Sequence, residues 1–137
     1  MKRYLLVFAA FLFSAMAWGQ TKPIKVVFDV TSKEPSTHQS AMRHVKMMTK
    51  AYPESQFEVV VYSGALDMVL KDHSSVTEDL LSLKDNKNVS FKVCEASLKR
   101  RQVGTSQLVA GVTTVPDGIL EIVTKQGEGW AYIKEAH

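Results

Sequence analysis

The chain has 137 residues, of which 45% are hydrophobic and 23% charged, with only 7 glycines and 4 prolines. This length fits a single domain, and the composition excludes disordered, collagen-like and low-complexity proteins. The formal net charge is +3, but part of it lies at the N-terminus. The charge therefore gives no reason to expect a nucleic-acid partner.

The N-terminus has the pattern of a secretory signal peptide. Two basic residues precede an apolar run over residues 4–13, and small residues follow it. A basic start, an apolar stretch too short for a stable membrane span and a small-x-small cleavage site are typical of an export signal. We predict that residues 1–19 are removed, with cleavage after Gly19 or, alternatively, after Ala17. Residues 20–137 then form a nearly neutral domain that is periplasmic or secreted and has no membrane attachment.

The first part of the mature chain predicts a strand, a helix and a second strand. Residues 24–30 form a β-branched apolar run typical of a strand. Ser36, with Gln39 three residues later, predicts a capping box, and apolar residues at helical spacing continue to Pro53. Residues 57–62 are a second apolar run and predict the second strand.

The middle of the chain continues the alternation of helices and strands. After a short apolar segment, Ser75 and Glu78 predict a second capping box and a helix with a buried stripe. Apolar and polar residues alternate over 89–93, which predicts a half-exposed third strand. Residues 94–103 have a helical pattern, and Gly104 is its expected end.

The last part of the chain predicts a short fourth strand and a final helix. The strand is expected around Gly111 and Val112, and Thr114 and Asp117 are expected to cap the helix. Pro116 is placed in the first turn of this helix, where its missing N–H costs nothing. The side chains predicted to face the core are those of Ile119, Ile122 and Val123.

A closing strand is predicted over residues 130–134. It is apolar on both faces, so either helices cover it or it is buried in a subunit contact. The first two strands are also apolar on both faces, as in parallel sheets covered by helices on both sides. We therefore predict an α/β fold with three layers and a mainly parallel sheet of about five strands.

The carboxyl ends of the predicted strands are where a parallel sheet places ligands and reactive groups. This rule selects Asp29 after the first strand, Ser63 and Gly64 after the second, and Cys94 after the third. We predict Cys94 as the catalytic residue and the other three as ligand-binding residues. Asp29 also fits the cap of a loop, and the Ser-Gly pair also fits a turn.

Cys94 is the only cysteine, so no internal disulfide is possible. At the start of a helix, unpaired backbone N–H groups and the positive end of the dipole stabilise a thiolate. Such a thiolate is a nucleophile and can accept a sulfur atom as a persulfide. The alternative is that Cys94 is a buried, inert residue that fills space beneath the helix.

We predict no cofactor and no metal. The four histidines have no metal-ligand spacing with cysteine or carboxylates. His44, Met47 and Met48 have a spacing that suits a soft metal such as Cu(I), but Met48 belongs to the predicted core stripe. No glycine-rich phosphate loop and no Ser-His-Asp pattern is present.

Three stretches resemble the DsrE/DsrF-like family, in particular its small exported members with a single domain. They are residues 91–99 (FKVCEASLK), 111–118 (GVTTVPDG) and 126–133 (QGEGWAYI). The resemblance implies a mainly parallel α/β fold for residues 20–137 and assembly into homo-trimers or hexamers. In sulfur-relay members of the TusD type, the cysteine that matches Cys94 carries a persulfide.

The resemblance thus implies a periplasmic sulfur-handling protein that carries or transfers sulfur on Cys94. Its partners would be further copies of the chain and a sulfur donor or acceptor protein. The alternative function is a non-catalytic oligomeric module that binds a small ligand or a protein, with Cys94 packed in the core.

Overall fold

Five parallel strands form one sheet in the order β4-β3-β2-β1-β5. The structure is a computed structural model that describes residues 22–136, so the predicted signal peptide at residues 1–19 lies outside the described residues. The strands are β1 (Lys25–Val30), β2 (Gln56–Val61), β3 (Val89–Cys94), β4 (Val112–Val115) and β5 (Ala131–Glu135). The prediction of a mainly parallel sheet of about five strands is confirmed.

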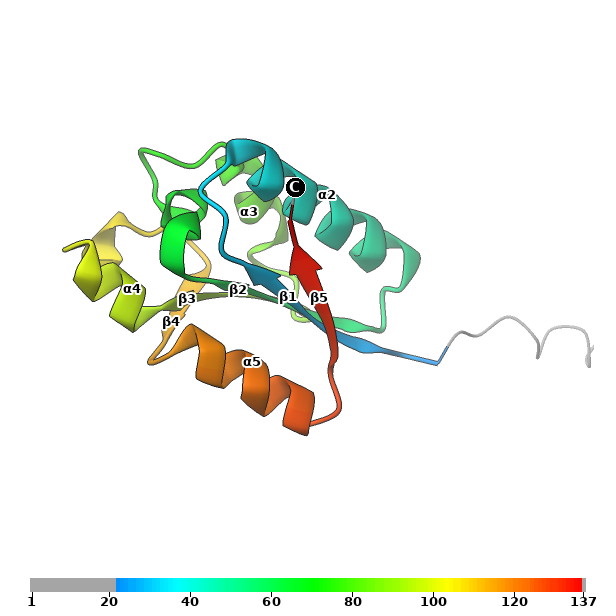
Figure 1. The fold of residues 1–137 in the computed structure, drawn as a ribbon. Helices are drawn as coiled ribbons and strands as arrows, with labels where there is room; N and C mark the ends of the chain where they lie inside the picture. Colours follow the sequence, from blue (N-terminus) through cyan, green and yellow to red (C-terminus); the bar gives the residue numbers. More distant parts are fainter. Residues whose placement is uncertain (1–21, 137) are drawn as a thin grey trace, which may run out of the picture.

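Helices cover both faces of this sheet, which confirms the predicted three layers (Figure 1). Figure 1 shows α2 and α3 on one side of the sheet and α5 on the other. The helical elements are α2 (Pro35–Ala51), η2 (Ser63–Val69), α3 (Thr77–Leu83), α4 (Glu95–Arg100), η3 (Thr105–Gln107) and α5 (Gly118–Gly127). Because all strands run in the same direction, their carboxyl ends meet at one edge of the sheet, where α4 and α5 begin.

The two faces of the sheet are packed very differently. On the α2 side, Phe28, Val59 and Phe91 lie side by side on neighbouring strands and are buried in the large core. On the α5 side, the buried apolar cluster contains only Val27, Val60 and Ile122, with Tyr62 and Trp130 packed against it. Buried polar residues, among them Asp29 and Glu58, lie on the α5 side, and so does the candidate site.

Both predicted capping boxes are wrong. Helix α2 begins at Pro35, with Glu34 as its N-cap and no capping side chain, so Ser36 lies inside the helix. Proline at the first position stabilises this earlier start, because its φ is already helical and it has no N–H to satisfy. Helix α3 begins at Thr77, and the hydroxyl of Ser74, not Ser75, accepts a hydrogen bond at its start, from Val76 N–H at 3.1 Å.

The helix after β3 ends earlier than predicted. Helix α4 stops at Arg100, and Gln102 reverses the chain in a left-handed conformation with φ 55°. Gly104, the predicted stop, has φ −88° and precedes η3. The backbone N–H groups of Gln102 and Val103 donate to the carbonyl oxygens of Lys99 and Leu98 at 3.1 and 3.0 Å, which is the Schellman pattern, so the helix ends here without a glycine.

The start of α5 is predicted correctly only in part. Asp117 is the N-cap, and its carboxylate accepts hydrogen bonds from the backbone N–H of Ile119 and Leu120. Pro116 precedes the cap and is not in the first turn. Thr114 does not cap α5, because its hydroxyl donates to the Glu95 carboxylate at 2.7 Å.

The outer side of α5 carries exposed apolar residues. Ile122 is buried as predicted, but Ile119 and Val123 do not face the core and are 60% and 58% exposed. Helix α5 begins at Gly118, and residues four positions apart lie on the same face of a helix. The face that packs on the sheet therefore carries Gly118 and Ile122, which are its buried residues. Strand β5 is an edge strand, and its residues 131–134 are exposed, so helices do not cover it.

No helix within residues 22–136 is long and apolar enough to cross a bilayer.

Candidate functional site

Cys94 is the last residue of β3 and the N-cap residue of α4, with φ −71° and ψ 120°. The sequence placed it at this junction of strand and helix, and the structure shows that its side chain is only 5% exposed. Hydrogen bonding by the backbone N–H groups of Gly118, Ser97 and Ala96 and by the Ser97 hydroxyl lowers the pKa of its thiol. The sulfur therefore lies where the first turns of α4 and α5 meet.

Burial and hydrogen bonding act in opposite directions on the pKa of Cys94. Burial is the largest single effect and raises the pKa, because it disfavours the charged thiolate. The hydrogen bonds to the sulfur favour the thiolate, and together they outweigh burial. The net result is a pKa for the Cys94 thiol below its ordinary value. Cys94 is thus a buried cysteine whose thiol has a pKa below the ordinary value.

Gly118 lets α5 approach the sulfur, and sequence reasoning missed its role. A Cβ atom at this position would lie 3.1 Å from the Cγ and Cδ1 atoms of the Tyr62 ring. Because Gly118 has no side chain, the Tyr62 ring packs directly against the start of α5. The backbone N–H of Gly118 is also the first of the groups that lower the pKa of the Cys94 thiol. The only signal in the sequence is that a glycine, rather than a good helix former, follows the N-cap Asp117.

Tyr62 connects the surroundings of Cys94 with those of Asp29. It follows β2, and its pKa is raised to about 12, first by burial and then by the negative charge of Asp29. Tyr132 on β5 donates a hydrogen bond to Asp29 Oδ2 at 2.6 Å. This bond is the main reason why the pKa of Tyr132 is also raised to about 12. Both phenols therefore keep their protons at neutral pH.

Asp29, a predicted ligand-binding residue, is 5% exposed and joins β1 to β5. Besides the bond from Tyr132, its Oδ1 atom lies 3.2 Å from the ammonium group of Lys134. Lys134 also donates a hydrogen bond to the Thr31 hydroxyl at 2.6 Å. The two carboxylate oxygens of Asp29 thus interact with Tyr132 and Lys134, both on β5. Tyr62 follows β2, which lies between β1 with Asp29 and β3 with Cys94.

Ser63 and Gly64, the other predicted ligand-binding residues, form the turn that starts η2. Ser63 has φ 58°, and its backbone N–H donates to the Ser97 hydroxyl at 3.0 Å. Ser63 therefore reaches the site through its backbone. Gly64 lies against the loop after β1, since a Cβ atom there would be 2.9 Å from the Thr31 carbonyl oxygen.

The residues weighed as soft-metal ligands lie elsewhere. His44 Nδ1 is 2.9 Å from the carboxylate of Glu135, so this histidine joins α2 to the end of β5. Met47 is 58% exposed on α2. Among the described residues 22–136, no group of three or more His, Cys, Asp or Glu residues is arranged to hold a metal ion.

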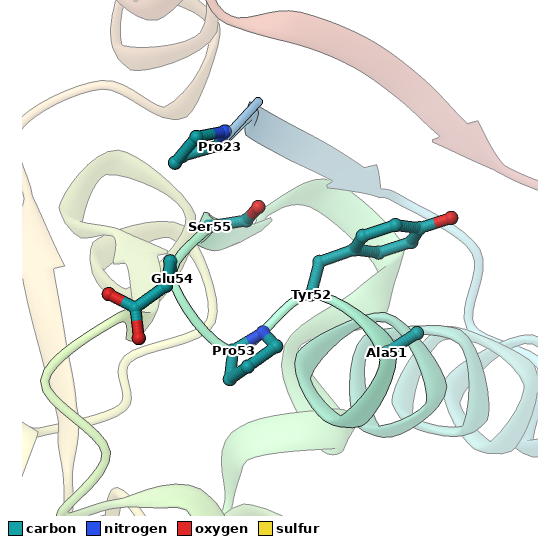
Figure 2. A pocket seen from close by; sticks show the side chains of 6 residues that line it. All are labelled: Pro23, Ala51, Tyr52, Pro53, Glu54 and Ser55. Atoms are coloured by element: carbon teal, nitrogen blue, oxygen red, sulfur yellow. The ribbon is translucent and has the colours of Figure 1, made fainter. Parts of the chain in front are cut away.

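Two shallow pockets lie at the opposite, amino end of the strands. One is shown in Figure 2 and is lined by Pro23, Ala51, Tyr52, Pro53, Glu54 and Ser55, where α2 leads into β2. The other is lined by Pro23, Ile24, Lys25, Glu128, Gly129 and Ala131, where α5 leads into β5. Neither pocket includes a residue of the Cys94 site.

Comparison with models of protein families identifies one family. A family model described as the DsrE/DsrF-like family matches residues 25–134. No curated protein matches the chain. The solved structure of MTH1491, a protein of unknown function from Methanobacterium thermoautotrophicum, is 29% identical in sequence and has a TM-score of 0.75. The match covers 81% of this chain and 98% of MTH1491.

Two more distant structures share the fold. The ychN protein from E. coli is 14% identical with a TM-score of 0.66, and the match covers 83% of this chain and 99% of that protein. BT1422, a conserved protein of unknown function from Bacteroides thetaiotaomicron, is 12% identical with a TM-score of 0.61. That match covers 80% of this chain and 93% of BT1422.

Proposed function

The chain belongs to the DsrE/DsrF-like family, and on this premise we propose that it is a periplasmic sulfur-handling protein that carries sulfur as a persulfide on Cys94. Family membership suggests a function of the sulfur-relay type. The observation that carries the proposal is the set of hydrogen-bond donors around Cys94 Sγ, which lowers the pKa of the thiol. The predicted signal peptide at residues 1–19 supports the periplasmic location.

The proposed chemistry needs only a thiolate and a donor that contains a sulfane sulfur. The Cys94 thiolate attacks that sulfur, a new S–S bond forms, and the S–S bond of the donor breaks. The remaining part of the donor leaves as a thiolate or hydrosulfide and takes a proton from water. An acceptor thiolate then attacks the outer sulfur, and Cys94 leaves as a thiolate. The backbone N–H groups of Ala96, Ser97 and Gly118 stabilise the negative charge on Sγ at both ends of this cycle.

Incubation of the mature protein with inorganic polysulfide is expected to add one sulfur atom to the wild type and none to Cys94→Ala. Intact mass spectrometry measures this, and a reducing thiol should remove the added mass. The pH dependence of alkylation by iodoacetamide should also show a midpoint below the free-cysteine value of about 8.5. An equal mass gain in Cys94→Ala, or no gain in the folded wild type, would contradict the proposal.

The second candidate function is a non-catalytic binding module in which Cys94 is packed. The observation that favours it is the small exposed fraction of this side chain, 5%. In that case iodoacetamide would modify Cys94 only after unfolding, or the midpoint of alkylation would lie above the free-cysteine value. The experiment above therefore separates the two functions.

We also propose that the chain assembles into a homo-oligomer, a trimer first and a hexamer second. The family supports this proposal, and so does the apolar outer side of α5, where Ile119, Leu120 and Val123 are 58–60% exposed. A second copy is the occupant that we propose for this side. Because Ile119 directly follows Gly118, such a contact would adjoin the Cys94 site.

Light scattering of the mature protein at micromolar concentration is expected to give the mass of a trimer or hexamer. Leu120→Lys should shift the assembly toward the monomer, because it would bury a charge in the proposed contact. Met47→Lys is the matched control, since Met47 is exposed to a similar extent, 58%, but lies on α2. A wild type that is purely monomeric, or equal effects of the two variants, would contradict the proposal.

A further inference from the structure

We propose that the outer side of α2 binds a soft monovalent cation of the Cu(I) type, with His44 and Met47 as its principal ligands and Met48 as a third. The site is separate from Cys94 and does not depend on the proposed sulfur chemistry. The spacing of the three side chains, the hydrogen bond that orients His44 and the exposure of Met47 support it.

The three side chains lie on one face of α2. His44, Met47 and Met48 occupy positions i, i+3 and i+4 of this helix. Residues with this spacing are neighbours on the helix surface, with Cβ atoms about 5–6 Å apart. Methionine side chains in a helix also lean toward its N-terminal end, onto the residues three and four positions earlier. The thioethers of Met47 and Met48 are therefore within reach of the His44 imidazole.

A buried carboxylate orients the His44 ring. Its Nδ1 atom is 2.9 Å from Oε1 of Glu135, a residue that is 4% exposed. An ionised carboxylate can only accept hydrogen bonds, so in the neutral ring Nδ1 carries the proton and Nε2 carries the lone pair. Within residues 22–136, Nε2 has no hydrogen-bond partner. Metal-binding histidines almost always donate their other ring N–H to a carboxylate, a carbonyl or water, which orients the ring and makes it more basic.

Both principal ligands are open to solvent. Met47 is 58% exposed, and the His44 side chain is 42% exposed. A metal ion can therefore reach them without any change in the fold. Met48 packs partly against the large core, so its sulfur is the third ligand and not a principal one.

The ligand types select the metal. Thioether sulfur is a soft ligand and imidazole suits copper, so one nitrogen with one or two thioethers favours Cu(I). Zinc sites instead take their ligands from cysteine, histidine and carboxylates, and no three such residues within 22–136 are arranged for this. The carboxylate of Glu135 beside the imidazole adds a negative charge that attracts a cation.

Ag(I) titration of the Cys94→Ala protein, residues 20–137, is expected to show one bound ion per chain, and Zn²⁺ should bind far more weakly. This background removes the thiol, which would bind Ag(I) itself, and Ag(I) does not oxidise in air as Cu(I) does. Calorimetry measures the affinity and native mass spectrometry the stoichiometry. Glu135→Gln should weaken binding about 10–100-fold, the usual effect of a change beside a metal-binding histidine. His44→Gln and Met47→Leu remove ligands and should each weaken it by about tenfold or more.

His73→Gln is the control for nonspecific binding to surface histidines. His73 is exposed in the turn between η2 and α3, so its replacement should leave the affinity for Ag(I) unchanged. Without metal, His44→Gln and Glu135→Gln should lose stability, because they break the contact between α2 and β5. Met47→Leu should keep its stability, because Met47 is exposed. Lost affinity at unchanged stability in Met47→Leu is a result that a purely structural contact would not produce.

The proposal would be overturned by a folded Cys94→Ala protein that binds no Ag(I), by unchanged affinity in Met47→Leu or by an equal loss in His73→Gln. If Glu135→Gln does not fold, the variants at the exposed positions 44 and 47 still decide. Labelling of Cys94 with polysulfide uses metal-free protein, so the proposed function can fail while the metal site stands, and the reverse.

Discussion

Replacement of Gly118 with alanine is expected to destabilise the fold by about 1–3 kcal/mol, in the range of overpacked positions, and to raise the pKa of the Cys94 thiol. The new Cβ atom would lie 3.1 Å from two atoms of the Tyr62 ring, closer than carbon atoms normally pack. Either the ring or the start of α5 must move. Movement of α5 weakens the hydrogen bond from the Gly118 N–H to Sγ, so both persulfide formation and alkylation should become slower.

Gly127→Ala provides the control on the same helix. Nothing lies within 4 Å of a Cβ atom at this position. Alanine costs less conformational entropy than glycine, so this variant should be more stable than the wild type by about 0.5 kcal/mol. Chemical denaturation measures the stabilities, and the pH profile of alkylation measures the thiol. The close packing of Gly118 would be contradicted if both glycine variants behaved alike.

Asp29→Asn is expected to lower the pKa values of both Tyr62 and Tyr132 from about 12 toward the ordinary 10. Removal of the negative charge makes each tyrosinate easier to form. The change should be larger for Tyr132, because its hydrogen bond to Asp29 is the main cause of its shift, whereas burial is the main cause for Tyr62. Tyrosinate absorbance as a function of pH measures both changes.

The same variant should lose about 1–3 kcal/mol of stability at neutral pH, less than a fully buried ion pair would cost, because Lys134 is 39% exposed and can turn to water. In the wild type, the contribution of the two tyrosines to the free energy of unfolding should be level below pH 10 and fall between about 10 and about 12. In that window the unfolded tyrosines have lost their protons and the folded ones have not. In Asp29→Asn this fall should be smaller.

Asp67→Asn is the matched control for Asp29→Asn. It also removes the charge of an ion pair, with Arg101 at 2.9 Å, but Asp67 is 39% exposed and is not among the groups that shift either tyrosine. Its tyrosine titration should be that of the wild type. If Asp29→Asn also left the titration unchanged, Asp29 would not be the source of the raised pKa values.

The sequence alone predicts much of the fold because local patterns determine it. The β-branched run at β1 and the alternation in β3 are local, and so is the capping of α5 by Asp117. The position of Cys94 between a strand and a helix is local too, so the central residue of the site could be predicted. The predicted capping boxes are absent because Pro35 starts α2 one residue before Ser36, and because Ser74 rather than Ser75 accepts the hydrogen bond from Val76 N–H before α3.

Only the tertiary structure decided what surrounds Cys94. The bond from Tyr132 to Asp29 joins residues 103 positions apart, and the bond from Ser63 to Ser97 joins residues 34 positions apart. These contacts depend on the order of the strands, in which β5 returns to pair with β1, and on where α5 crosses the sheet. The sequence thus determined the α/β fold and the place of the thiol. The effect of Gly118 on the pKa of this thiol, and the contact of Ser63 with Ser97, arise between segments that only the packed sheet brings together.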